Sequence, residues 1–251
     1  MNQITNLKFP KLIGHRGVKN LCPENTLESI NKAFDLGLSC VEIDVKISKD
    51  QIPILLHDDT IDRTTTGTGL ASELNYSFLK KLDAGKFFYN RKTKNFIPKL
   101  IDVIDLCRKR KKNLNIELKP NKNFEEINVL KIVEITKNIK DINIFFSSFD
   151  LISFIKISEL FSESKRSFLI DTFNEYSIND LLTLLKKYQA NICGLNIKII
   201  TNEVIKKIKE NNIIITAYSD KNISFKQAKK YFDMGVDSIF TDNPNELLKQ
   251  F

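Results

Sequence analysis

Hydrophobic and polar positions alternate along most of the chain in patterns that predict short strands separated by helices. Within residues 41–45, the apolar side chains face one side of a predicted strand, and Glu42 and Asp44 face the other. The predicted strands begin near residues 11, 41, 114, 142, 167, 192, 213 and 238. Helical spacing between and after them predicts helices over 25–36, 100–110, 124–138, 150–162, 178–188, 203–210, 225–234 and 245–249.

Strands that alternate with helices indicate a parallel sheet with right-handed crossovers, and eight such units close into a barrel. The alternative is an open doubly wound sheet, which should have a glycine-rich phosphate loop. Neither GxGxxG nor GxxxxGK occurs in the sequence. We therefore expect an α/β protein, a TIM (β/α)8 barrel formed by residues 1–251 as a single domain, with residues 1–10 as a lead-in.

The sequence between the second and third predicted barrel strands departs from this alternation. A short return strand over 52–56 is followed by irregular sequence over about 58–98, which contains one short predicted helix at 76–82. We expect a small insertion after the second barrel strand, lying over one face without a core of its own. Long loops of this kind often cover functional sites.

Composition changes this picture little, since 42% hydrophobic and 28% charged residues are ordinary for a soluble globular protein. The cysteines at 22, 40, 107 and 193 form no CxxC pair, which argues against a structural zinc site and a disulfide framework. No apolar run reaches about 18 residues, and the N-terminus has no signal-peptide pattern. We expect a cytoplasmic protein without stable membrane insertion.

The net charge of +8 favours anionic partners, although much of it comes from dispersed lysines. The densest basic run is RKRKK at 108–112, which suits the carboxyl end of a helix. Contact with nucleic acid or an anionic membrane is the alternative. Because no nucleic-acid-binding motif accompanies the run, no nucleic-acid partner is expected.

Polar residues follow the predicted strands, and the active sites of TIM barrels lie at the carboxyl ends of their strands. The only two histidines, His15 and His57, each end a short apolar run. A reference pKa near 6.5 suits both to general acid and base catalysis, whereas the alternative is a packed or surface role. Arg16 offers a planar guanidinium to a phosphate or carboxylate.

Three carboxylates are expected at the same barrel mouth, namely Glu42, Asp44 and Glu117. Their oxygens suit a hard divalent cation, Mg²⁺ or Ca²⁺. Alternatively, Glu117 forms an ion pair with Lys119 or Arg16. A cation, an arginine and two histidines together have the chemistry needed for attack on a phosphodiester.

The sequence PENT at 23–26 precedes the first predicted helix. Asn25 is expected to cap this helix, with Glu28 as its capping-box partner, and Gly37 is expected to end it. Glu24 either favours the helix N-terminus or belongs to the site.

Most of the candidate residues stand in the segments GHRG at 14–17, PENT at 23–26, VEIDV at 41–45 and IELK at 116–119. Together these segments resemble the glycerophosphodiester phosphodiesterase family. The resemblance implies a TIM barrel with a small insertion that hydrolyses small-molecule glycerophosphodiesters to sn-glycerol 3-phosphate and an alcohol. Expected substrates are deacylated phospholipids such as glycerophosphocholine and glycerophosphoethanolamine. The matching segments follow the family's order over nearly the whole chain: GHRG at 14–17, PENT at 23–26, VEIDV at 41–45, HDDTIDRTTTGTG at 57–69, LDAG at 82–85, IPKL at 97–100, IELK at 116–119 and GVDSIFTDNP at 235–244.

The resemblance also implies residue roles. Attack on phosphorus would come from the glycerol hydroxyl, giving a cyclic phosphate, or directly from water. TAYS at 216–219 departs from the family pattern, which affects the pocket wall and the alcohol preference, and Tyr218 is expected to supply an aromatic ring from a shifted position. The implied roles are an acid/base pair of His15 and His57, a Mg²⁺ or Ca²⁺ site of Glu42, Asp44 and Glu117, and phosphate binding by Arg16 and Lys119.

Two other functions are compatible with the same barrel. The first is a phospholipase acting on lysophospholipid or phosphoinositide head groups, against which we note no exposed apolar loop in the sequence. The second is an inactive protein that binds an anionic ligand, which should lack one of the candidate residues. The complete set in this sequence argues against the inactive protein.

Overall fold

The structure is a computed structural model that describes residues 9–250, so most of the predicted lead-in, residues 1–8, lies outside the described residues. Its centre is a closed ring of parallel strands, because β1 pairs with both β2 and β9. This closure excludes the open doubly wound sheet and confirms the TIM barrel. The barrel strands are β1 (Leu12–Gly14), β2 (Cys40–Ile47), β4 (Asn113–Leu118), β5 (Ile144–Ser148), β6 (Lys165–Ile170), β7 (Ile192–Asn196), β8 (Ile214–Tyr218) and β9 (Ser238–Thr241).

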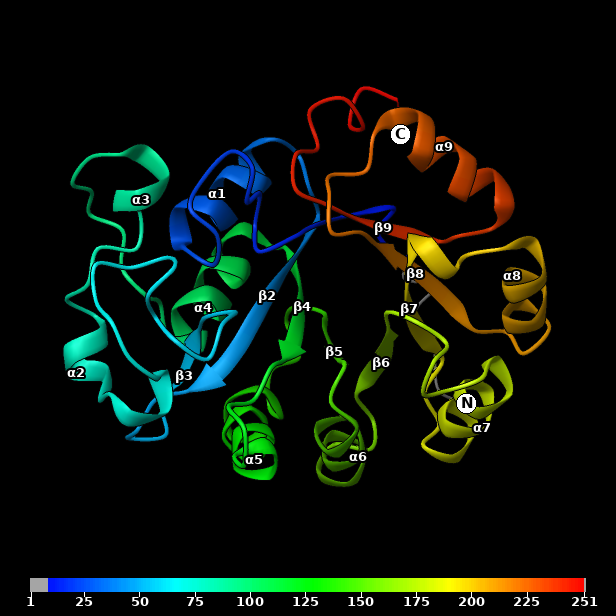
Figure 1. The fold of residues 1–251 in the computed structure, drawn as a ribbon, viewed down its shortest axis with the longest axis horizontal. Coiled ribbons are helices and arrows are strands. Elements are labelled where there is room, and N and C mark those ends of the chain that lie inside the picture. The colour runs from blue at the N-terminus through cyan, green and yellow to red at the C-terminus, as the bar shows by residue number, and fades with distance from the viewer. Residues whose placement is uncertain (1–8, 251) are drawn as a thin grey trace.

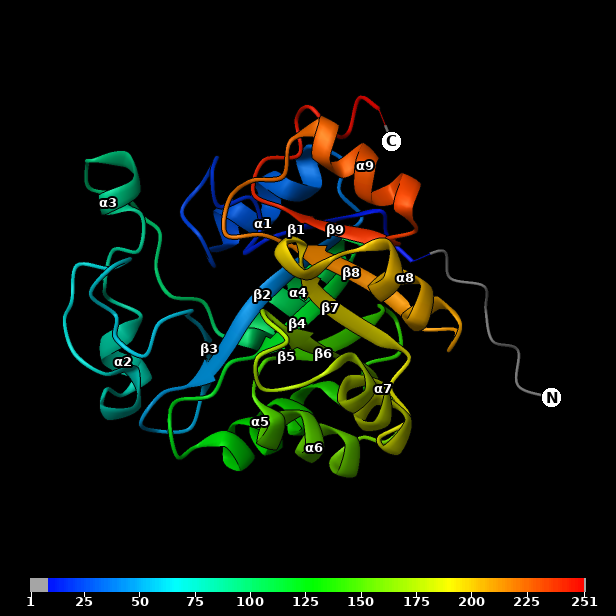
Figure 2. The ribbon, with the colours of Figure 1, turned by 45° about the vertical axis from the view of Figure 1, so that its right-hand side comes forward.

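Helices surround the ring of strands, as Figures 1 and 2 show. Val41, Ile43 and Val45 on the outer face of β2 belong to the main core between strands and helices, as their alternation predicted. No helix within residues 9–250 is long and apolar enough to cross a membrane. The surrounding helices are α1 (Leu27–Asp35), α4 (Leu100–Arg110), α5 (Glu125–Thr136), α6 (Leu151–Leu160), α7 (Ile178–Lys187), α8 (Asn202–Lys209) and α9 (Phe225–Met234).

All eight barrel strands begin within two residues of their predicted starts. The predicted closing helix is wrong, because residues 245–250 form turns. So short a segment needs tertiary packing to stay helical, and within 245–249 only Leu247 is buried. Gly37 does follow α1 with a φ of 107°, as expected for a residue that ends a helix.

The insertion lies at one side of the barrel, and α3 projects from it in both views (Figures 1 and 2). It is preceded by β3 (Pro53–Leu55), which pairs antiparallel with the end of β2. A 3₁₀ turn (Ala71–Glu73), α2 (Tyr76–Leu79) and the unpredicted α3 (Lys86–Tyr89) follow. The expectation that the insertion lacks its own core is wrong, because a separate buried cluster unites β3 with it: Ile54, Leu56, Ile61, Ala71, Tyr76, Leu79 and Ile97.

An apolar layer fills the amino-terminal half of the barrel interior and supports the polar residues above it. Since strand side chains alternate, each inward-facing residue is followed two positions later by another on the same side. Cys40 therefore precedes Glu42 and Asp44, and Ile13 precedes His15 on the inner face. The apolar layer consists of Ile13, Cys40, Phe145, Ile192 and Phe240.

Candidate active site

The residues that the sequence placed at strand ends meet at the carboxyl end of the barrel. His15 and Arg16 follow β1, and His57 lies two residues beyond β3. The cavity they share has a volume of about 490 Å³, and Asp44 lies buried beside it. The predicted site residues that line this cavity are His15, Arg16, Glu42, His57, Glu117 and Lys119.

Three carboxylates lie together at the floor of the cavity. Glu42, Asp44 and Glu117 each offer an oxygen, and these oxygens all lie within 4.8 Å of one another. Glu42 Oε1 and Asp44 Oδ1 are buried and accept no hydrogen bond from the described part of the chain. A buried carboxylate oxygen without a donor is unfavourable, and a bound cation would remove the penalty. The oxygen-only donor set therefore fits a hard divalent cation.

The ionisation of these carboxylates reflects their crowding. Burial and the charges of Asp44 and Glu117 raise the pKa of Glu42 well above its ordinary value. Burial also raises the pKa of Glu117, and Asp44 adds to the effect, although Lys119 opposes it. Burial would raise the pKa of Asp44 too, but Arg16 and Lys119 lower it below its usual range. The crowding of three buried carboxylates thus disfavours the ionised forms of Glu42 and Glu117.

The alternative ion pair of Glu117 exists beside this cluster. Lys119 Nζ lies 2.9 Å from Glu117 Oε1 and 3.9 Å from Asp44 Oδ1. Arg16 pairs instead with Asp44, with 3.1 Å between Nε and Oδ2. The pairing of Glu117 engages only Oε1, so Lys119 and a cation are compatible partners for this side chain.

Asn25 does not cap α1, although we expected it to do so. It positions the carboxylate of Asp44 instead. Thr26 is the N-cap, because its hydroxyl accepts a hydrogen bond from the Ser29 N–H. Asn25 has a φ of 56°, and from this conformation its amide donates to Asp44 Oδ2 at 2.8 Å. Its Oδ1 also accepts from the Asp44 N–H at 3.2 Å. The predicted cap was wrong by one residue because spacing alone does not reveal a left-handed backbone.

Glu24 belongs to the site. Its carboxylate accepts a hydrogen bond from Arg16 Nη1 at 2.8 Å and two more from Arg63, each at 2.8 Å. Arg63 also donates to Asp58, at 2.6 and 3.0 Å. One network therefore joins the barrel arginine to the insertion, and sequence reasoning assigned no role to Arg63.

Each histidine is oriented by an aspartate. His15 Nδ1 lies 2.7 Å from Asp242 Oδ1, and His57 Nδ1 lies 2.6 Å from Asp58 Oδ1. These bonds fix the tautomer that leaves Nε2 of each ring for other partners. Burial lowers the pKa of both histidines. Neutral imidazoles are thus favoured at neutral pH, as a general base requires. Asp242 lies within the matching segment 235–244, to which the sequence alone gave no role in the site.

The wall formed by the ends of β6 and β8 carries the segment that departs from the family pattern. Tyr218 lines the cavity, and its ring meets Phe149 edge to face, with 5.4 Å between ring centroids. The same wall includes Asp171 and Asp220. An aromatic ring thus stands where the sequence expected one.

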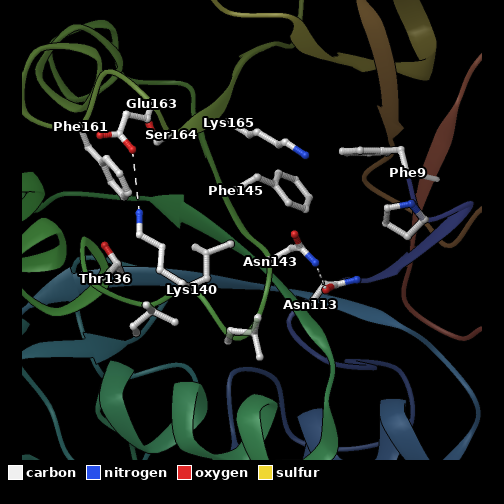
Figure 3. A pocket seen from close by; sticks show the side chains of 14 residues that line it. Phe9, Asn113, Thr136, Lys140, Asn143, Phe145, Phe161, Glu163, Ser164 and Lys165 are labelled. Atoms are coloured by element: carbon white, nitrogen blue, oxygen red, sulfur yellow. Dashed lines mark hydrogen bonds and ion pairs between the residues drawn. The ribbon is translucent and has the colours of Figure 1, made fainter. Parts of the chain in front are cut away.

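A second cavity, of about 240 Å³, lies at the amino-terminal end of the strands (Figure 3). Figure 3 shows Lys140 directed towards Glu163, 3.9 Å away, and Asn143 bonded to Asn113. None of the predicted site residues lines this cavity. The basic run at 108–112 also lies away from the active-site mouth. It ends α4 and leads into the first residue of β4, at the amino-terminal end of the barrel strands. The run therefore forms a helix end, as predicted.

Comparison with known proteins places this geometry in a family. The model of the glycerophosphoryl diester phosphodiesterase family matches residues 15–246. A glycerophosphodiester phosphodiesterase of Bacillus altitudinis is 30% identical over 246 residues, which cover 95% of this chain and 97% of the relative. One from Caldanaerobacter subterraneus is 26% identical, over 94% of this chain and 96% of the relative.

Solved structures agree with the sequence matches. The structure of an Oleispira antarctica phosphodiesterase in complex with the product sn-glycerol-3-phosphate superposes with a TM-score of 0.89. It is 30% identical to this chain, and the match covers 96% of each chain. A glycerophosphodiester phosphodiesterase from Thermotoga maritima has a TM-score of 0.76 at 25% identity, covering 97% of this chain and 99% of that one. The chain therefore belongs to the glycerophosphoryl diester phosphodiesterase family and is a phosphoric diester hydrolase.

Proposed function

We propose that this protein hydrolyses glycerophosphodiesters such as glycerophosphocholine and glycerophosphoethanolamine to sn-glycerol 3-phosphate and the corresponding alcohol. Relatives named glycerophosphodiester phosphodiesterase support the reaction, and the Oleispira antarctica phosphodiesterase binds sn-glycerol-3-phosphate. The observation that carries the proposal is the meeting of three buried carboxylates with two aspartate-bonded histidines around one cavity.

In this proposal, Glu42, Asp44 and Glu117 hold Mg²⁺ or Ca²⁺. Glu42 Oε1 and Asp44 Oδ1 support this role, because neither accepts a hydrogen bond from the described residues. A bound cation would supply positive charge that offsets the charge developing on the phosphate oxygens. Arg16 keeps guanidinium N–H groups beyond those used for Glu24, and Lys119 lines the same cavity, so both can donate to the phosphate.

His15 and His57 form the acid/base pair of the proposed reaction. One imidazole takes the proton of the attacking hydroxyl through Nε2 as the new P–O bond forms. The other enters the step as an imidazolium and gives its Nε2 proton to the departing alcohol oxygen as the old P–O bond breaks, so one ring gains a proton and the other loses one. Asp242 and Asp58 hold the rings in the required tautomer and stabilise the protonated forms.

The test is a product assay with the full chain on several glycerophosphodiesters, comparing Mg²⁺ with Ca²⁺. We expect release of sn-glycerol 3-phosphate that a chelator abolishes and one of the two cations restores. His15→Ala should lower the rate at least about 100-fold, which is the typical contribution of a general acid or base. Full activity of His15→Ala, or no product from any diester with either cation, would contradict the proposal.

We also propose a cytoplasmic location for this reaction. Cys22, Cys40, Cys107 and Cys193 are all buried and unbonded, which supports a reducing compartment. Measuring the number of reactive thiols in the unfolded protein purified under non-reducing conditions checks this inference. Four reactive thiols are expected, and a smaller number would count against it.

A further inference from the structure

Exposed apolar side chains gather on the connections that follow three neighbouring barrel strands. Large apolar residues are exposed at nine positions within residues 9–250. Eight of them lie in the insertion or within six residues of the carboxyl ends of β4 and β5, and the ninth, Leu130, lies further along α5. The strands β2, β4 and β5 are adjacent in the barrel. Our expectation that no apolar loop is exposed was therefore wrong. The residues are Leu70, Phe78, Phe87, Phe88 and Phe96 in the insertion, Phe124 after β4, and Phe149 and Ile152 after β5.

The insertion combines these rings with a strong positive charge. Residues 78–96 contain six lysines and arginines and one acid, a net charge of +5 out of +8 for the whole chain. All six cations are exposed, whereas the acid, Asp83, accepts hydrogen bonds from Thr93 and the Gly85 N–H. Positive charge around exposed aromatic rings is therefore not balanced within the segment.

The projecting part of the insertion is its most amphipathic part. Phe87 is 56% exposed and Phe88 is 43% exposed on α3, which stands away from the barrel in Figures 1 and 2. We call its exposed residues the α3 surface. They are Lys86, Phe87, Phe88, Arg91, Lys92 and Lys94.

The α3 surface adjoins the active-site mouth. Phe87 and Phe88 line a shallow cavity of about 240 Å³ together with Glu24, Arg63 and Lys19. Lys19 also lines the catalytic cavity. Whatever binds the α3 surface therefore lies beside the entrance to the site.

We propose that the α3 surface docks reversibly on an anionic lipid bilayer. Aromatic rings favour the interfacial layer of a membrane, and neighbouring lysines and arginines are attracted to anionic head groups. A short projecting helix can enter a fluid head-group layer, which need not offer a complementary shape. Docking would turn the mouth of the barrel towards the membrane surface. It does not depend on the proposed reaction, because it rests on surface residues outside the cavity.

The charge contribution is tested by co-sedimentation of the full chain with phosphatidylcholine vesicles that either contain or lack phosphatidylglycerol. We expect binding only to the anionic vesicles, weakening as salt is raised. Arg91→Gln/Lys92→Gln/Lys94→Gln should lower the partition coefficient about 100-fold, at about fivefold per cation. The matched control is Arg108→Gln/Lys109→Gln/Lys111→Gln, which removes three positive charges at the carboxyl end of α4, near the amino-terminal end of the barrel strands, and should bind nearly as wild type.

The aromatic contribution is tested with Phe87→Ser/Phe88→Ser, with Leu130→Ser as the control for loss of an exposed apolar group. The double variant should lose most vesicle binding at physiological salt, and Leu130→Ser should not. Circular dichroism melts report folding independently of enzymatic activity. Equal binding to both vesicle types, or equal losses in test and control variants, would overturn the proposal. Binding to polyglutamate without binding to anionic vesicles would also overturn it, in favour of an acidic protein partner.

Discussion

Replacing Glu42 by glutamine should stabilise the metal-free protein while abolishing its activity. Glu42 is 1% exposed, lies among two other carboxylates, and leaves Oε1 without a donor among the described residues. A glutamine carbonyl would keep the 2.8 Å hydrogen bond from the Arg16 backbone N–H. Its amide NH₂ would then occupy the position of Oε1, where it can donate to Asp44 or Glu117.

The size of the stabilisation by Glu42→Gln follows from the spacing of the three carboxylates. Two like charges at 4.8 Å, the upper limit of the separations among the three oxygens, repel by about 3.5 kcal/mol at an effective dielectric constant of about 20. Arg16 offsets part of this repulsion, and protonation of Glu42 relieves more. We therefore expect a gain of about 1–2 kcal/mol in the free energy of unfolding, which raises Tm by about 2–8 °C in a chain of this length.

This stabilisation should depend on pH with a definite sign. The pKa of Glu42 is raised in the folded state, so the buried carboxyl lowers the free energy of unfolding of the wild type when the unfolded chain is ionised at this position. This loss of stability is absent below about pH 4.5, where the carboxyl is protonated in both states. The loss grows as pH rises towards the folded-state pKa. The advantage of Glu42→Gln should therefore appear above about pH 4.5 and increase towards neutrality.

The assay is thermal unfolding of wild type and Glu42→Gln in chelator, with exposed Glu246→Gln as a matched control. Addition of Mg²⁺ or Ca²⁺ should stabilise the wild type by about 2.7 kcal/mol at 100 times its Kd, and should stabilise Glu42→Gln much less. A lower Tm for Glu42→Gln in chelator would refute the reasoning. Equal stabilisation of both proteins by the cation would refute the metal role of Glu42.

Three further predictions follow from the same site. Arg63→Met should lower kcat about 10- to 100-fold with little change in KM, because Asp58, which orients His57, then loses both hydrogen bonds from Arg63. A KM effect alone in steady-state kinetics would contradict this. In a pH profile of kcat/KM, the lowered pKa values of His15 and His57 predict an acid limb below pH 6.5, and a midpoint above 6.5 would argue against neutral imidazoles. Gly17→Ala should lower the free energy of unfolding by about 2–4 kcal/mol, measured by urea denaturation. The φ of Gly17 is +83°, and the new Cβ would lie 2.4 Å from Ser29 Oγ. An unchanged urea midpoint would exclude this strain.

The barrel and the core of its site were predictable from local patterns. Alternation within 41–45 determines which face of β2 carries Glu42 and Asp44, and the order of strands and helices determines that their carboxyl ends meet. These properties depend on sequence neighbours only. For the same reason the starts of all eight barrel strands were predicted within two residues.

The supporting residues could not be predicted in the same way. Arg63 lies in an irregular segment, and its partners Glu24 and Asp58 become neighbours only after the insertion packs beside the barrel. Asn25 depends on a positive φ that its spacing does not reveal. The exposed rings of α3 were visible as residues, but their exposure depends on how a short helix packs. Tertiary contacts, not periodicity, specify these features.

The most direct test of the central claim is ³¹P NMR of glycerophosphocholine incubated with the full chain and a divalent cation. We expect conversion of the diester signal to that of sn-glycerol 3-phosphate, with no phosphocholine, and no conversion by His57→Asn or in chelator. Appearance of phosphocholine, or conversion that persists in His57→Asn, would contradict it.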